Sequence, residues 1–237
     1  MKLILSYFKI NFLTTVRNTP ALFFTLIFPP LILVLTAHQW GSDTKSQLEA
    51  FVIYLNYSVQ TVSLMLLGMA VSQEKNSHWS KYVRTLPAPV STMVLGRLMH
   101  TLALCFINLI LISVVAVFVL SIPVTLAQLI FFFGVALLGA IPMALIGMSI
   151  GYAASPESSR SIFTLLNLML LFGSFSLPDG GLFSYVRAAV PTFQWKELSL
   201  HILNPASSIV SPLVCLSVYT ILFAMFFGRV YSKSSQK

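Results

Sequence analysis

Six long apolar runs occupy most of this sequence and constrain the fold more than any other feature. They cover residues 20–37, 50–72, 94–120, 126–153, 162–177 and 206–228. A helix needs about 20 apolar residues to cross the hydrocarbon core of a membrane, and it satisfies its own backbone polar groups there. The sequence lacks the ~10-residue alternating segments of a membrane β-barrel. We therefore expect an all-α integral membrane protein with six transmembrane helices in one domain, residues 1–237.

Composition supports the membrane class. The chain is 57% hydrophobic and only 8% charged, whereas a soluble domain carries roughly 25% charged residues. So few charges cannot cover a surface that faces water. Cys105 and Cys215 lie within apolar runs, where thiols pack as small hydrophobic groups. They show neither a disulfide framework nor metal-ligand spacing.

Lysine and arginine predict the orientation, because cytoplasmic loops of membrane proteins collect these residues. On an alternating topology, one side carries only Lys45, Arg187 and Lys196. The other eleven lie on the side of both termini: Lys2, Lys9, Arg17, Lys75, Lys81, Arg84, Arg97, Arg160, Arg229, Lys233 and Lys237. We therefore expect both termini in the cytoplasm. The basic residues lie at helix ends rather than in one patch, so we expect no nucleic-acid partner.

Residues 1–18 precede the first apolar run and have an amphipathic pattern. Lys2, Ser6 and Lys9 approximate a polar stripe, and Leu5 and Phe8 fall on another face. This pattern predicts a helix in the cytoplasmic membrane interface, with its basic side chains near lipid phosphates.

The polar stretch 73–89, between the second and third runs, contains a second amphipathic pattern. Apolar side chains recur at i, i+3, i+4 and i+7, at Trp79, Tyr82, Val83 and Leu86. Pro87 and Pro89 end the pattern. Such a helix could lie on the bilayer or dock in a groove of a partner protein. The pattern alone leaves both possibilities open.

Two other segments between runs are short or partly apolar. Residues 155–160 form a brief loop in which Ser155 or Ser158 could cap the next helix. Residues 178–205 are too polar to span but are not hydrophilic, which favours re-entrant or interfacial helices on the outer side. The fifth run is short, so it could continue into this outer segment.

Polar side chains within the second run form one face, with Asn56, Gln60 and Ser63 at i, i+4 and i+7. Such residues face either a neighbouring helix or a wet cavity, and both interpretations stay open. The fourth run contains small residues at intervals of four, at Ala136, Ala140, Ala144, Gly147 and Gly151. This spacing predicts close packing against another helix.

Several activities are excluded by what the sequence lacks. No run carries an acidic or basic residue at membrane depth, which disfavours ion-coupled transport. Serine-hydrolase and zinc-protease motifs are missing, and the four histidines show no ligand spacing. The sequence also has no G-x-x-x-x-G-K-[ST] phosphate-binding loop. We therefore expect neither an enzyme nor a bound cofactor or metal.

Three segments, taken in order, resemble the membrane subunit of ABC-2 type ABC transporters. Residues 17–30 (RNTPALFFTLIFPP) are similar to the link between the interfacial helix and the first span. The family's first cytoplasmic loop is similar to residues 74–90, which begin with Glu74-Lys75 and end with YVRTLPAPV. In this chain Asn76-Ser77 replaces the usual Lys-Gly step of that loop. Residues 190–198 (VPTFQWKEL) are similar to the segment before the last span.

The resemblance implies a permease of a bacterial exporter that works with a separate ABC ATPase, which binds ATP and magnesium. A second permease chain, identical or different, would pair with this one, and spans one, two and five would line the path. Segment 178–205 would help to close an outer gate. The implied ATPase-coupling residues are Glu74, Lys75, His78, Trp79, Tyr82, Val83, Arg84, Leu86, Glu157 and Arg160. The candidate path residues are Asn56, Gln60, Ser63 and Asn167.

Two alternatives remain beside an exporter of drugs, peptides or lipids from the cell membrane. A small-molecule-binding component of an uptake system also has about six helices, but the amphipathic stretch after the second run has no evident use there. An intramembrane enzyme is disfavoured by the missing catalytic motifs. Association with an ATPase distinguishes the exporter from the enzyme.

Overall fold

The computed structural model describes residues 2–40, 43–75, 77, 90–175, 182–204 and 208–235, and within these ranges the regular elements are all helical. The α-helices are α1 (Lys2–Arg17), α2 (Thr19–Leu22), α3 (Phe28–Thr36), α4 (Thr44–Gln60), α5 (Leu67–Glu74), α7 (Val90–Val114), α8 (Leu126–Ala153), α9 (Pro156–Phe175), α10 (Leu182–Ala189), α11 (Pro191–Leu200) and α12 (Val210–Ser235). Three π-helical segments, η1 (Phe23–Ile27), η3 (Thr61–Leu66) and η4 (Val115–Val119), continue α2, α4 and α7, and a short 3₁₀ turn, η2 (Ala37–Gln39), follows α3.

Four helical stretches are long and apolar enough to cross a membrane: Thr44–Glu74, Thr92–Val119, Leu126–Ala153 and Val210–Ser232. They correspond to the second, third, fourth and sixth predicted spans. The first predicted span contains a shorter apolar helix, Phe23–Gln39. The fifth corresponds to α9, which has 20 residues but includes Glu157, Arg160 and Asn167. The multi-span helical class is therefore confirmed, whereas the number six stays a prediction.

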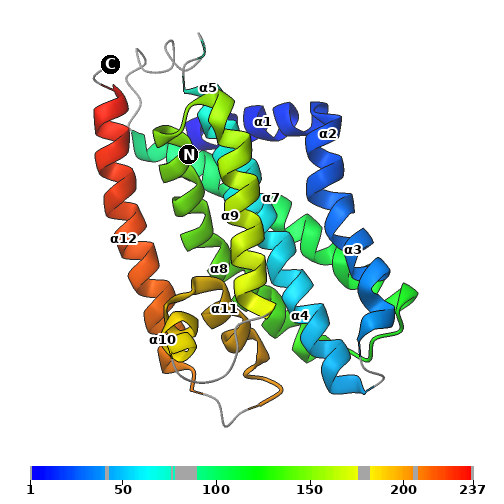
Figure 1. The fold of residues 1–237 in the computed structure, drawn as a ribbon. Helices are drawn as coiled ribbons and strands as arrows, with labels where there is room; N and C mark the ends of the chain where they lie inside the picture. The colour runs from blue at the N-terminus through cyan, green and yellow to red at the C-terminus, as the bar shows by residue number, and fades with distance from the viewer. Residues whose placement is uncertain are drawn as a thin grey trace.

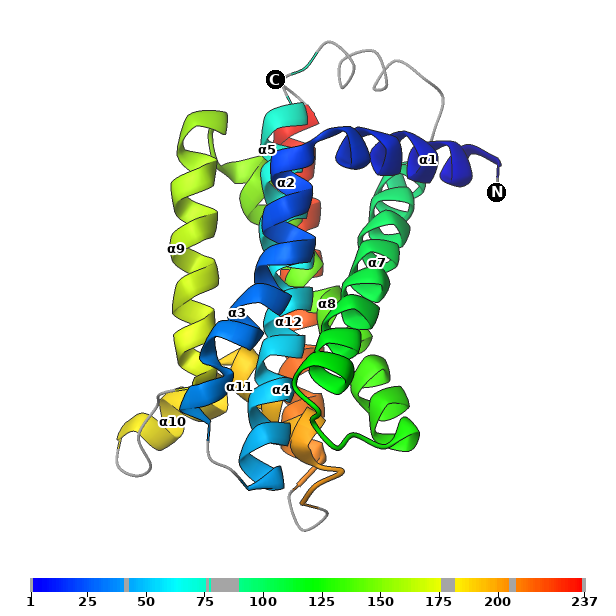
Figure 2. The ribbon, with the colours of Figure 1, turned by 90° about the vertical axis from the view of Figure 1, so that its right-hand side faces the viewer.

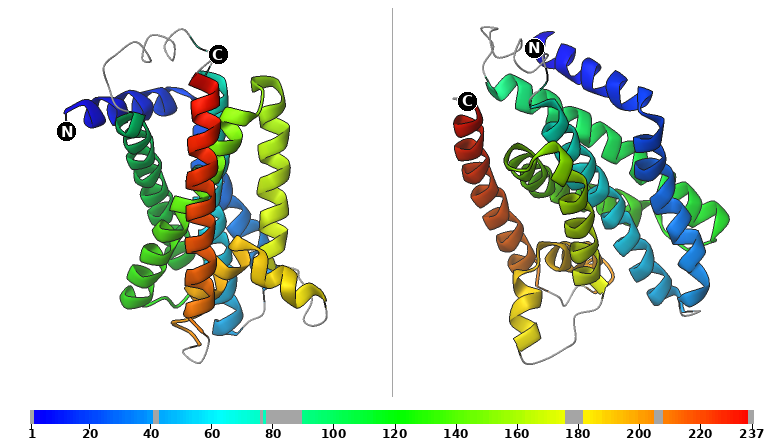
Figure 3. Two further views of the ribbon diagram at one scale, coloured as in Figure 1. Left: turned by 90° about the vertical axis from the view of Figure 1, so that its left-hand side faces the viewer. Right: turned by 45° about the horizontal axis from the view of Figure 1, so that its top comes forward.

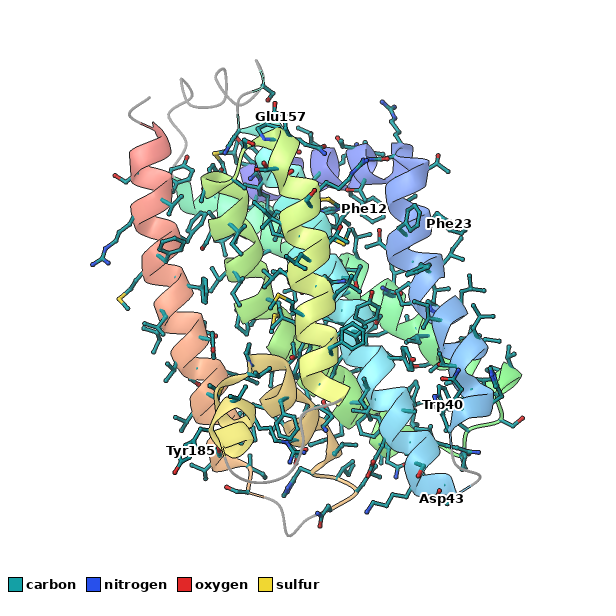
Figure 4. All side chains as sticks on the ribbon, in the orientation of Figure 1. Phe12, Phe23, Trp40, Asp43, Glu157 and Tyr185 are labelled. Atoms are coloured by element: carbon teal, nitrogen blue, oxygen red, sulfur yellow. The ribbon has the colours of Figure 1, made fainter. Side chains whose placement is uncertain are left out.

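The long helices form a bundle, with α1 lying across one end of it (Figures 1 and 2). We call this the terminal end, because α1 and the last turns of α12 both lie there. The basic residues Arg17, Lys75, Arg160 and Arg229 stand on elements that reach the terminal end. The opposite end carries the start of α4, with α10 and α11. Figure 4 shows Glu157 at the terminal end and Asp43 and Tyr185 at the opposite one.

Helix α1 packs on α7 through one face. The side chain of Tyr7 is buried, and a Cβ added to Gly96 of α7 would lie 2.7 Å from the Tyr7 Cβ. Phe12 makes an edge contact with His100 of α7, with ring centroids 6.2 Å apart. Apolar side chains elsewhere on α1 are exposed, including Leu5 at 62%. This arrangement suits a helix that lies in the membrane interface, and its contact with lipid stays a prediction.

Consecutive prolines shape the helix formed by α2, η1 and α3. Pro29 and Pro30 have no N–H, so the Thr25 carbonyl lacks both its i+4 and its i+5 helical donor. The Asn108 side chain of α7 replaces them, since its Nδ2 donates to Thr25 O (2.8 Å) and also to Ser58 O of α4 (3.3 Å). Asn108 is fully buried. One amide thus joins the first three predicted spans at the proline bend.

The stretch formed by α4, η3 and α5 lies at the centre of the bundle, and α8 packs closely against it. A Cβ added to Gly147 would lie 2.6 Å from the Leu64 carbonyl oxygen, and one added to Gly151 would lie 2.5 Å from that of Gly68. These glycines let two backbones meet directly, as their spacing predicted. Figure 3 shows α12 along the outer side of this layer, where it contacts α8 and α11.

Candidate functional site

The base of the loop between α5 and α7 is held by an ion pair. Helix α5 ends at Glu74, and Arg97 lies two turns into α7. Their side chains meet at 2.7 Å, between Arg97 Nη2 and Glu74 Oε2. The Arg97 side chain is 12% exposed and that of Glu74 is 30% exposed. The pair therefore joins the helix that enters the loop to the helix that leaves it, in a site partly screened from water.

Lys75 joins the same loop to the end of α8. The last carbonyls of a helix have no partner within the helix and carry partial negative charge, so a lysine there is favourable. The Lys75 Nζ donates to the carbonyls of Tyr152 (3.0 Å) and Ala154. Ser72 adds a bond from its hydroxyl to the Ala154 carbonyl (3.2 Å). Burial lowers the pKa of Lys75, and the nearby Glu157 carboxylate opposes that effect.

Tyr152 contacts three elements at this point. Its hydroxyl lies 3.4 Å from Arg97 Nη1, and its carbonyl accepts from Lys75. Its ring packs against Phe227 and Tyr231 of α12, with centroids 5.8 and 5.2 Å away. We refer to Glu74, Lys75, Arg97 and Tyr152 as the basal cluster, which ties the loop to α7, α8 and α12.

Helix α9 begins beside the basal cluster. The Ser155 hydroxyl accepts from the Ser158 N–H (3.3 Å), so Ser155 caps α9, one of the two caps that the sequence left open. Glu157 and Arg160 lie in its first turns, and Arg160 is exposed. The structure thus places the predicted coupling residue Glu157 near Lys75, which follows Glu74 in the chain. Six other predicted coupling residues lie outside the described residues, and the helix there stays a prediction: His78, Trp79, Tyr82, Val83, Arg84 and Leu86.

A second polar cluster lies buried between α4 and α9. Gln60 Nε2 donates to the Asn167 side-chain oxygen (2.8 Å) and to the Asn167 carbonyl (3.0 Å). Asn167 Nδ2 in turn lies 3.4 Å from the Tyr57 hydroxyl and 3.3 Å from that of Thr61. All four side chains are buried. Two candidate path residues, Gln60 and Asn167, therefore contact each other directly.

The other two candidate path residues have different partners. Asn56 donates to the Ser199 hydroxyl of α11 (3.1 Å), and its own Oδ1 is buried without a partner among the described residues. Ser63 bonds to the Val59 carbonyl of its own helix (2.7 Å). In this state the polar face of α4 joins α9 and α11. Its role in a transport path stays a prediction.

Helix α11 enters the bundle from the opposite end. Trp195 is fully buried, and its indole N–H donates to the Val135 carbonyl of α8 (3.0 Å). The indole occupies the space above Gly139, where a Cβ would collide with it. Arg187 and Lys196 lie 4.5 and 4.4 Å from the Phe193 ring centroid. The described part of this segment, residues 182–204, is therefore largely helical, and its helix α11 packs into the bundle.

The sequence did not identify three residues that bond to the predicted site residues: Arg97, Tyr152 and Ser199. Arg97 was recognised only as a topological charge, and no spacing relates it to Glu74 across the intervening loop. A signal did exist for Tyr57 and Thr61, since Tyr57 lies three residues before Gln60 and four before Thr61, the spacings at which side chains on one helix are neighbours.

Replacing Asn167 with leucine should destabilise the protein by about 1–3 kcal/mol, because Gln60 and Tyr57 would stay buried without their partner. Unfolding of the purified protein in mixed micelles, titrated with sodium dodecyl sulfate, measures the change. Thr164→Leu on the exposed side of α9 is the matched control and should have no effect. Equal stability of the two variants would contradict the role of this cluster.

Within the described residues, histidine, cysteine and acidic side chains form no group of three that could hold a metal. A family model described as ABC-2 family transporter protein matches residues 46–228. No curated protein matches the chain.

Proposed function

The chain belongs to the ABC-2 family of transporter proteins, and we propose that it is the permease subunit of an ATP-driven exporter. The observation that carries this proposal is the family match, which reaches from α4 to α12. The subunit would lie in the bacterial cell membrane with its terminal end in the cytoplasm. It is a transport component, and ATP and magnesium would bind to a separate ATPase.

The ATPase would dock at the terminal end, on the loop 73–89. Two features support docking of the ATPase at this loop. The basal cluster fixes the loop to three helices, so a force applied there would reach the bundle. The Trp79, Tyr82, Val83 and Leu86 stripe would supply an apolar face for a groove of the ATPase. Glu157 and Arg160, at the start of α9, would form a lesser contact.

Two permease chains would pair around a path formed by α3, α4 and α9. Helices α3 and α9 both contact the buried α4, which lies between them in Figure 1. Both present exposed apolar side chains, including Leu35 at 60% on α3 and Met169 at 63% and Phe172 at 62% on α9. The polar groups behind them, at Asn56, Gln60, Ser63 and Asn167, are uncharged. This lining suits amphipathic or hydrophobic cargo, such as a drug, an antimicrobial peptide or a lipid. Helices α10 and α11 would close the outer gate.

The docking role predicts that Trp79→Ala with Tyr82→Ala releases the ATPase while the permease stays in the membrane. Loss of two aromatic anchors from a docking helix typically costs several kcal/mol of binding, enough for at least about a hundred-fold loss of affinity. Recovery of the ATPase with the tagged permease from detergent extracts measures this.

A control with Phe226→Ala and Tyr185→Ala, which removes two exposed aromatic side chains outside the loop, should retain the ATPase. Undiminished recovery with the Trp79 and Tyr82 variant would contradict docking at this loop.

A wild-type complex that accumulates cargo inside cells instead of exporting it would favour the uptake alternative.

A further inference from the structure

We propose that Arg97 and Tyr152 are positioning residues that make the coupling loop (residues 73–89) move as one body with the α8–α9 junction. This inference rests on the proposed function, because it concerns how movement of the ATPase would reach the transport path. Neither residue belongs to the docking stripe. Both lie within the bundle, where they hold the base of the loop.

The Glu74–Arg97 ion pair closes the loop at its base. Residues 75–89 leave α5 and return to α7, and the Glu74–Arg97 bond at 2.7 Å joins the two helices. Without this bond, α5 and α7 could separate when the loop is pulled. Because both charges are partly buried, their attraction is screened less than that of an exposed pair. The pair therefore resists separation of the two helices.

Lys75 and Arg97 connect this base to α8. Lys75 bonds to the Tyr152 and Ala154 carbonyls, and Arg97 bonds to the Tyr152 hydroxyl. Each of the two cations thus contacts the same turn of α8. A displacement of the loop base must either move the end of α8 or break these charge-assisted bonds, which are stronger than neutral ones.

Helix α9 connects α8 to the path. Only Ala154 and Ser155 separate α8 from α9, so the start of α9 must follow the end of α8. Along α9, Asn167 bonds to Gln60 of α4. The basal cluster is therefore linked to the buried polar face of α4 through short, packed connections. Loss of the Arg97–Glu74 pair should weaken the link between nucleotide binding and the movement of α9, because only the bonds from Lys75 and Ser72 would then join the loop base to the end of α8.

The test measures movement of α9 in the permease–ATPase complex in lipid nanodiscs. Spin labels replace Thr164 on α9 and Val218 on α12, after the native cysteines are changed to alanine, and labelled chain is diluted with unlabelled chain. Distances are recorded without nucleotide and with ATP and vanadate. In the wild type we expect a nucleotide-dependent shift. In Arg97→Ala and in Glu74→Gln, the shifted fraction should fall at least about five-fold, the lower limit of typical coupling between sites.

Rescue distinguishes coupling from mere stability. The exchanged pair, Glu74→Arg with Arg97→Glu, should restore the shift, and Arg229→Ala, which removes an exposed arginine from α12, should leave it unchanged. Glu74→Gln keeps the size of the side chain, so it tests the role of the ion pair even if Arg97→Ala does not fold. A full shift in Glu74→Gln, or no rescue by the exchanged pair, would overturn the inference while leaving the proposed function intact. A wild-type chain that forms no ATPase complex would overturn both.

Discussion

Replacing Gly147 with alanine is expected to destabilise the protein by at least about 3 kcal/mol, at the upper end of the usual cost of overpacking. The new Cβ would lie 2.6 Å from the Leu64 carbonyl oxygen and 3.0 Å from that of Ser63. Both are backbone atoms in the central helix, so neither can rotate away. The helices would have to separate, and the packing of α8 on η3 would be lost. Gly147→Leu should leave little folded protein.

Gly134 provides the control on the same helix. A Cβ added there meets no atom within 4 Å, so Gly134→Ala should be neutral or slightly stabilising, as expected for glycine in a helix. Size-exclusion profiles of the detergent-extracted variants, recorded after heating to a series of temperatures, measure both changes. Similar profiles for Gly147→Ala and Gly134→Ala would contradict the close contact of the two backbones.

Trp195→Ala is expected to cost about 3–5 kcal/mol, the usual range for removal of a fully buried tryptophan. The indole fills the space above Gly139 and donates to the Val135 carbonyl (3.0 Å). Its loss should release α11 from α8 and open the opposite end of the bundle. Trp195→Phe keeps part of the packing and should have an intermediate effect.

The measurement is the rate at which trypsin cleaves at Lys196 in purified protein, together with the unfolding midpoint in mixed micelles. Tyr185→Ala removes a 77% exposed aromatic side chain at the same end and should change neither value. If Trp195→Ala behaves like Tyr185→Ala, α11 is not anchored by this side chain.

The long helices were largely predictable from local sequence, whereas the partners they pack against were not. Apolar runs identified the four long stretches because length and hydropathy are properties of consecutive residues. The spacing of Gly147 and Gly151 likewise predicted a close helix contact. The partner of that contact was not predictable, since the four-residue interval does not identify Leu64 and Gly68. Nothing in the sequence indicated that Asn108, 83 residues after Thr25, would bond to the Thr25 carbonyl.

The candidate site was likewise predictable only where its residues are close in the sequence. Family resemblance predicted Glu74 and Lys75 as coupling residues, and the structure adds which side chains and carbonyls hold them. Their partners, Arg97 and the end of α8, come from distant parts of the chain and meet only when the bundle folds. The polar face of Asn56, Gln60 and Ser63 was visible as a helical pattern, yet the pattern could not distinguish a helix contact from a cavity. The bonds to Asn167 and Ser199 show helix contacts in this state.

The central claim, that this chain is one permease of an ATP-driven exporter, is tested most directly by native mass spectrometry. The sample is the complex that the tagged, full-length chain retains when it is extracted from its own cell membrane. The account predicts two permease chains, identical or different, with two ABC ATPase subunits, and loss of the ATPase mass in the Trp79→Ala, Tyr82→Ala variant. A chain that remains single, or that assembles without an ATPase, would contradict it.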